Sequence, residues 1–208
     1  ASPERVWDFI NGLHEMGTEK AQQDLELIKE IRDGEISGDK NTPIKPWNYS
    51  YYRNQHLKKA YQVDHEKIRE YLPMQECLAG MMNIYQQLLA LEFRKVENPS
   101  VWHEEVEMYE VYEDGVLRGR FYLDLFPRPN KEGWYYGVPI IRGKQTQKGY
   151  EIPTSMLLGN FTRPTDQTPS LITHGELRTL FHEFGHIMDG MSYKGDYMMQ
   201  ARSKSDFS

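Results

Sequence analysis

The 208-residue sequence predicts a mainly α-helical protein with a small antiparallel or mixed β-sheet, which is an α+β fold. Up to about residue 93, and again at 177–188, apolar residues recur every three or four positions, the spacing of amphipathic helices. Between residues 101 and 162 the period changes to two, which is typical of half-buried strands. We therefore expect a helical region at 1–100, a sheet region at 101–165, and a region at 166–208 with one further helix and the start of the next segment.

The first region is predicted to contain several helices. An apolar stripe opens a helix near the start of the chain and continues until Asp33 and Gly34 break it. Two prolines mark residues 41–47 as a loop. Further helices are expected at 49–61 and from Pro73 to Leu89.

The second region is predicted to begin with a β-hairpin. Apolar and polar residues alternate over 106–112, Glu113-Asp114-Gly115 has the composition of a tight turn, and a second run follows at 117–125. Another strand is expected at 155–161. It directly precedes the helix of the third region.

The third region contains the pentad His182-Glu183-Phe184-Gly185-His186. Because an α-helix turns about 100° per residue, positions four apart lie on one face, so His182 and His186 can ligate a single zinc ion. Glu183 lies about 100° further round the helix, which suits a general base that takes a proton from a metal-activated water. A surface helix with two solvated histidines is the alternative interpretation.

The predicted zinc helix has recognisable ends. Thr173 and Glu176 have the spacing of a capping box, so the helix is expected to begin near His174. Gly190 is the expected end. An interior glycine costs a helix about 1 kcal/mol relative to alanine, so Gly185 indicates the close approach of a neighbouring backbone.

A tetrahedral catalytic zinc needs a third protein ligand, and the residues near the pentad do not supply one by spacing. Asp189 and Glu176 are poorly placed on the helix relative to His182, and His174 lies before the helix. Asp196 and Asp206 lie in the segment that follows, and their spacing does not favour them.

Composition excludes several other classes of protein. The net charge of −6 argues against nucleic acid as a partner, because phosphate binding needs clustered Lys and Arg. No run approaches the ~18 apolar residues of a membrane span, and Ala1-Ser2-Pro3-Glu4 has no signal-peptide character. Cys77 is the single cysteine, so no internal disulfide forms. We therefore expect a cytoplasmic protein without a membrane partner; the composition does not predict its oligomeric state.

The zinc segment resembles the motif of the thimet oligopeptidase family, which includes neurolysin, oligopeptidase A and dipeptidyl carboxypeptidase. Further family-like segments follow one another in order along the whole chain: Pro46–Tyr52, Val101–His103, Gly119–Arg128, Asn160–Thr162, Pro169–His174 and Thr179–His186. The resemblance implies a zincin-like catalytic region. It further implies a zinc metalloendopeptidase or oligopeptidase that hydrolyses short peptides, with Glu183 as general base.

The resemblance also implies where the third zinc ligand lies. In the family it is a glutamate that follows an Asp-Phe pair, and this chain ends Asp206-Phe207-Ser208. We therefore expect the third ligand beyond Ser208, one incomplete catalytic domain, and a fragment that is itself inactive. Two positions depart from the family pattern: Asp189 stands where histidine is usual, and Gly133-Trp134 replaces a more basic stretch.

The strand expected at 155–161 directly precedes the zinc helix, and an edge strand in this place can bind the substrate backbone by strand addition. Leu158, Gly159 and Asn160 are therefore predicted as substrate contacts. The alternative is that this strand only packs on the helix. Two other functions stay open. One is a non-catalytic fragment that binds peptides or metal. The other is a deformylase-like metallohydrolase in which an upstream cysteine, Cys77, completes the zinc site.

Overall fold

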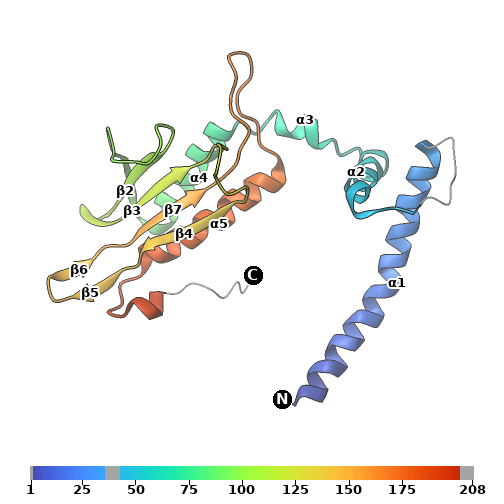
Figure 1. The fold of residues 1–208 in the computed structure, drawn as a ribbon, viewed down its shortest axis with the longest axis horizontal. Coiled ribbons are helices and arrows are strands. Elements are labelled where there is room, and N and C mark those ends of the chain that lie inside the picture. The colour runs from blue at the N-terminus through green and yellow to red at the C-terminus, as the bar shows by residue number, and fades with distance from the viewer. Residues whose placement is uncertain (1, 36–42, 202–208) are drawn as a thin grey trace. The chain divides into compact units, whose positions relative to one another are not determined.

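The computed structural model describes residues 2–35 and 43–201 (Figure 1). Residues 1–64 and residues 65–208 form two compact units. Asp206, Phe207 and Ser208, which the sequence analysis placed next to the expected third ligand, lie outside the described residues. No helix within residues 2–35 or 43–201 is long and apolar enough to cross a membrane.

The first unit consists of two helices in contact, α1 (Pro3–Glu35) and α2 (Pro46–Tyr61). Helix α1 continues through Gly34 to Glu35, so the expected break comes slightly later than predicted. Helix α2 begins three residues earlier than predicted. Its first residue is Pro46, where a proline is favourable because the first helical N–H has no partner within the helix.

The second unit has a mixed five-stranded sheet in the order β1-β2-β3-β7-β4 (Figure 1). Strands β3 and β7 are parallel, and the other neighbouring pairs are antiparallel. The strands are β1 (Glu92–Lys95), β2 (Glu107–Glu113), β3 (Val116–Asp124), β4 (Tyr136–Ile141) and β7 (Thr154–Leu158). A separate hairpin pairs β5 (Lys144–Thr146) with β6 (Gly149–Glu151). An α+β fold with a mixed sheet is thus confirmed.

Four helical segments accompany this sheet in the described part of the second unit. They are α3 (His65–Arg69), α4 (Met74–Leu89), α5 (His174–Ser192) and the short 3-10 helix η1 (Met198–Ala201). Helix α5 contacts β3, β4 and β7 and also contacts α4. The pentad therefore lies on a helix that is packed along the sheet.

The β2–β3 hairpin forms where the sequence predicted it. Its turn uses Asp114 and Gly115, which have φ angles of 51° and 76°. Both angles are positive, as a two-residue hairpin turn of this kind requires, and Asp-Gly is one of the pairs that adopt them readily. Strand β1 was not predicted, because its residues were assigned to the end of the helical region.

Helix α5 packs on the sheet through a cluster of aromatic rings. Phe184 is fully buried, and its ring centroid lies 5.2 Å from that of Tyr85, 6.0 Å from that of Phe93 and 5.3 Å from that of Phe121. These rings come from α4, β1 and β3. Because Phe184 lies inside the pentad, the core fixes the same turn of helix that carries the two histidines.

The start of α5 agrees with the sequence, but its end does not. The Glu176 amide N–H donates to Thr173 Oγ1 at 3.2 Å, and the Thr173 amide N–H donates to Glu176 Oε2 at 2.7 Å, so the capping box is confirmed. Gly190 was expected to end the helix, but α5 continues to Ser192. The reason is packing: Met191 is buried in the core, and that burial requires the helix to extend past Gly190.

Candidate metal centre

His182 and His186 lie one turn apart on α5 and face each other. Their Nε2 atoms are 3.2 Å apart, and their ring planes are inclined at 87°. Two nitrogens that each lie about 2.0–2.1 Å from one tetrahedral zinc ion are about 3.3–3.4 Å apart. The observed separation is therefore close to that of two imidazole nitrogens that share a zinc ion.

The opposite face of this helical turn is buried. Phe184 and Ile187 belong to the hydrophobic core, whereas His182 is exposed and His186 is half-buried. The histidines therefore face away from the core while the backbone that carries them is held by it. Such support from packing is what a preformed ligand pair needs.

Glu183 points towards β4. Its Oε2 accepts a hydrogen bond of 2.7 Å from the backbone N–H of Gly137. The carboxylate is half-buried, between the helix and the strand. The structure thus brings His182, Glu183 and His186 together on one helix and adds Gly137, which the sequence analysis did not identify.

The described residues do not supply a third metal ligand. Within residues 2–35 and 43–201, no three His, Cys, Asp or Glu side chains are grouped so that they could hold an ion. Glu176 is engaged elsewhere, because it accepts hydrogen bonds from Thr173 and, at 3.2 Å, from the hydroxyl of Tyr135. His174, Asp189 and Asp196 likewise join no such group, and Asp206 lies outside the described residues.

Cys77 does not join the histidines in such a group either. Burial raises the pKa of the Cys77 thiol, and the nearby Glu76 raises it further. A zinc ligand is a thiolate, so this environment favours the wrong protonation state for a metal-binding cysteine.

The strand that contains Leu158 is internal rather than at the edge of the sheet. Strand β7 pairs with β3 on one side and with β4 on the other. The expectation of an edge strand was therefore wrong for this segment, because both of its edges are already paired with strands of the same sheet. Lys131 Nζ donates to the Gly159 carbonyl at 2.6 Å, and Tyr135 Oη donates to that of Asn160 at 3.1 Å. Strand addition at Leu158, Gly159 and Asn160 is thus blocked; side-chain contact with a peptide there stays a prediction.

Strand β4 is the edge strand next to α5. It contacts the helix, and among the residues that the structure describes it has β7 as its one neighbour in the sheet. A sequence signal for this was available in Pro139, because a proline inside a strand is confined to sheet edges or bulges. The pairing of β4 with β7 shifts register between Pro139 and Ile141, as a bulge does.

Gly185 does have a close neighbour, but it is a side chain. A Cβ at this position would lie 3.2 Å from the hydroxyl of Tyr85 on α4. That hydroxyl donates to the carbonyl of Phe181 at 3.1 Å. The predicted close approach is real, whereas the expectation that a backbone makes it was wrong.

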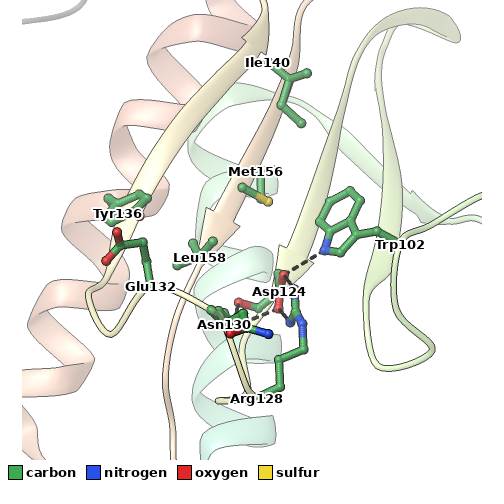
Figure 2. A pocket seen from close by; sticks show the side chains of 10 residues that line it. Trp102, Asp124, Arg128, Asn130, Glu132, Tyr136, Ile140, Met156 and Leu158 are labelled. Atoms are coloured by element: carbon green, nitrogen blue, oxygen red, sulfur yellow. Dashed lines mark hydrogen bonds and ion pairs between the residues drawn. The ribbon is translucent and has the colours of Figure 1, made fainter.

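A buried charged cluster that the sequence analysis did not identify lies at the end of β3. Asp124 is 2% exposed and accepts two hydrogen bonds from Arg128, at 2.6 and 2.7 Å, and one from Trp102 at 3.0 Å (Figure 2). Burial by itself would raise the pKa of Asp124, but bonds from Arg128, Lys131 and Trp102 outweigh it and lower the pKa to about 2.

Lys131 completes this cluster. Its amino group lies 2.8 Å from Asp124 Oδ1 and donates to the carbonyls of Asp124, Phe126 and Gly159 at 2.9, 2.7 and 2.6 Å. Burial lowers the pKa of the Lys131 amine, against the opposing effect of the Asp124 carboxylate. The cluster joins the end of β3 to the segments before β4 and after β7.

A pocket of about 370 Å³ adjoins the cluster (Figure 2). Met156 and Leu158 line it, and they alternate along β7 with Leu157, which faces the α5 core. The pocket therefore lies on the sheet face turned away from α5. Neither histidine of the pentad lines it.

With this arrangement established, the comparison with known proteins identifies the class: the chain belongs to peptidase family M3, a family of zinc metallopeptidases whose model matches residues 1–207. The resemblance to the thimet oligopeptidase family is thereby confirmed.

Several relatives can be named. A thimet-like oligopeptidase of Dictyostelium discoideum is 36% identical over 95% of the chain. Oligopeptidase A of Escherichia coli is 30% identical over 91% of the chain, and saccharolysin of Saccharomyces cerevisiae is 31% identical over 87%.

The chain spans only part of the length of these relatives: 31% of the Dictyostelium protein, 28% of the bacterial one and 27% of saccharolysin. A mitochondrial intermediate peptidase of Arabidopsis thaliana is also similar, at 27% identity. The expected cytoplasmic location of this chain therefore stays a prediction.

Proposed function

We propose that this chain provides part of the active site of a zinc-dependent oligopeptidase that hydrolyses short peptides. His182 and His186 would hold the zinc ion, and the third protein ligand would come from outside the described residues. The observation that carries the proposal is the 3.2 Å separation of the two Nε2 atoms on a helix fixed by the core. Membership of peptidase family M3 supports it.

When bound, zinc would lower the pKa of water towards ~7 and polarise the carbonyl of the scissile bond. The protein's own contribution to proton transfer is assigned to Glu183. Its carboxylate would accept a proton from the attacking water and pass it to the leaving amine. Its half-buried position between α5 and β4 is consistent with that role, because it limits the directions in which the side chain can point.

We further propose β4 as the strand against which a peptide backbone lies. An edge strand offers its outward backbone groups to an extended peptide. On β4 the Gly137 N–H is already donated to Glu183 and Pro139 has no N–H, so the outward carbonyls of the strand would accept from the peptide. Strand β4 is at the edge of the sheet and next to Glu183. This assigns to β4 the strand addition that the sequence analysis expected at residues 158–160.

Zinc titration of the 208-residue chain tests the metal ligands. Two histidines completed by water should bind Zn²⁺ weakly, and His182→Ala or His186→Ala should abolish the binding. His174→Ala is the matched control, because His174 is an exposed histidine at the start of the same helix. Equal binding by His182→Ala and the unchanged chain would refute the assignment. Nanomolar affinity would refute the two-ligand site and require a third ligand nearby.

A fluorogenic peptide assay tests the activity. We expect no hydrolysis by the 208-residue chain, and zinc-dependent hydrolysis by a longer parent protein that includes the third ligand. Glu183→Gln in that parent should abolish turnover. A parent that binds zinc but does not hydrolyse any short peptide would favour the non-catalytic alternative. Loss of metal binding in Cys77→Ser would favour the deformylase-like one.

A further inference from the structure

Gly137 is the point where the edge strand meets the pentad. It pairs in register with Leu157 of β7, yet its N–H points away from β7 and donates to Glu183 Oε2 at 2.7 Å. Alternate residues of an edge strand direct their N–H groups outward. In this structure one such outward N–H has the Glu183 carboxylate as its acceptor.

The close approach of strand and helix depends on the absence of a side chain at this position. A Cβ on Gly137 would lie 2.6 Å from the backbone oxygen of Glu183 and 3.3 Å from Cγ1 of Ile187. The first distance is well below van der Waals contact, and the helix backbone cannot move aside as a flexible side chain could. Glycine at 137 is therefore explained by the proximity of α5.

The segment that leads into β4 is held firmly. Asn160 Nδ2 donates to the carbonyls of Glu132 and Trp134, both at 2.8 Å. The single proton of the Tyr135 hydroxyl is shared between the Asn160 carbonyl at 3.1 Å and Glu176 at 3.2 Å. Figure 2 shows Glu132 and Tyr136 at this entry to β4, where they line the pocket. The position of the Gly137 N–H is thus set by contacts independent of the metal ligands.

We propose that Gly137 is a positioning residue: its amide N–H orients the carboxylate of Glu183 for proton transfer, and glycine is required there so that β4 can approach α5. The proposal rests on the proposed role of Glu183 as general base. A carboxylate that accepts a short hydrogen bond from a rigid backbone donor keeps one orientation instead of sampling several rotamers.

Amide hydrogen exchange in the 208-residue chain, followed residue by residue by NMR, tests this contact. Glu183→Ala should accelerate exchange of the Gly137 amide at least ~10-fold, the change expected when a hydrogen bond to a charged acceptor is lost. Amides of β7 should keep their rates. Asp189→Ala is the matched control, because it removes an exposed carboxylate from the same helix. Unchanged exchange at Gly137 in Glu183→Ala would overturn the proposal.

A second variant keeps the proposal falsifiable if Glu183→Ala disturbs the helix. Gly137→Ala should expose the amide of residue 137 to exchange while the affinity for Zn²⁺ stays that of the unchanged chain, because both histidines lie on α5, whose pentad turn packs through Phe184 on α4, β1 and β3 rather than on β4. Gly133→Ala is its control, since a Cβ there meets nothing within 4 Å. If Gly137→Ala weakened zinc binding as much as His182→Ala does, the position would act on the whole helix, and the proposal would fail.

These measurements require neither turnover nor a third ligand. Failure of the exchange experiment would remove the role of Gly137 and leave the proposed peptidase intact. Failure of the parent protein to hydrolyse peptides would leave the hydrogen bond in place.

Discussion

Replacement of Asp124 by asparagine should destabilise the second unit in a pH-dependent way. Asp124 is buried and receives hydrogen bonds from Arg128, Lys131 and Trp102. Asparagine keeps the size of the side chain but removes the charge. Lys131, whose side chain is 2% exposed, would then be left as a buried cation without its carboxylate partner.

The size of the effect follows from the pKa of Asp124. The hydrogen bonds lower it from an ordinary value of 3.8 to about 2. At about 1.4 kcal/mol per pH unit, this difference corresponds to roughly 2 kcal/mol of stability from the ionised carboxylate. Because the folded-state pKa is depressed, this stability is fully present above pH 3.8 and is lost as the pH falls through about 2.

Urea unfolding of the original chain and of Asp124→Asn, measured between pH 7 and pH 2.5, gives the comparison. The difference in unfolding free energy should be constant from neutral pH to about pH 5 and should shrink below about pH 4. Asp114→Asn is the matched control, because Asp114 is exposed in the β2–β3 turn and asparagine also accepts its positive φ. A difference below about 0.5 kcal/mol at neutral pH, or one that does not change with pH, would refute the reasoning.

Three further changes test the packing around the site. Lys131→Met should cost about 3 kcal/mol or more in urea unfolding, because it removes one donor from the buried Asp124 carboxylate and from three carbonyls; an unchanged unfolding free energy would mean that Lys131 does not stabilise the cluster. Thr173→Ala should cost about 1 kcal/mol in thermal unfolding through loss of the α5 cap, and an unchanged midpoint would contradict it. Phe184→Ala should lower the unfolding free energy in urea by about 3–5 kcal/mol. A loss of less than about 1 kcal/mol would show that the aromatic cluster does not stabilise the packing of α5 on the sheet.

The parts of the fold that local chemistry determines could be predicted from the sequence. The capping box at Thr173 and the Asp114-Gly115 turn depend on residues within a few positions of each other. The pentad is of the same kind, because helical geometry alone brings His182 and His186 to one face. Their 3.2 Å separation needs the helix and, in addition, rotamers that turn both imidazoles towards each other.

The parts that long-range pairing determines could not be predicted in the same way. Strand β7 is internal because β4, which precedes it in the sequence, pairs on its free side. The alternation of apolar residues does not encode which strand becomes a neighbour. The contact of Gly137 with Glu183 depends on that pairing, so it became visible only in the fold.

Gly190 and β1 illustrate how tertiary burial overrides local preference. A glycine near the end of a helical pattern is a common stop, yet Met191 is drawn into the core and α5 continues. Phe93 was read as the end of a helical zone, yet its ring packs on Phe121 and Phe184 as part of β1. In both cases the secondary structure is determined by the packing of an apolar side chain against residues that are distant in the sequence.

The burial of Phe184 and Ile187 beside the histidines has a consequence for how metal loading relates to folding. In small zinc modules the ion is the main source of folding energy, and a chelator unfolds them. Here the turn that carries His182 and His186 is held by apolar packing against three other elements. At the proposed metal site, zinc would therefore bind to a helix that is already folded, and folding rather than metal binding would supply the entropy cost of bringing the two imidazoles together.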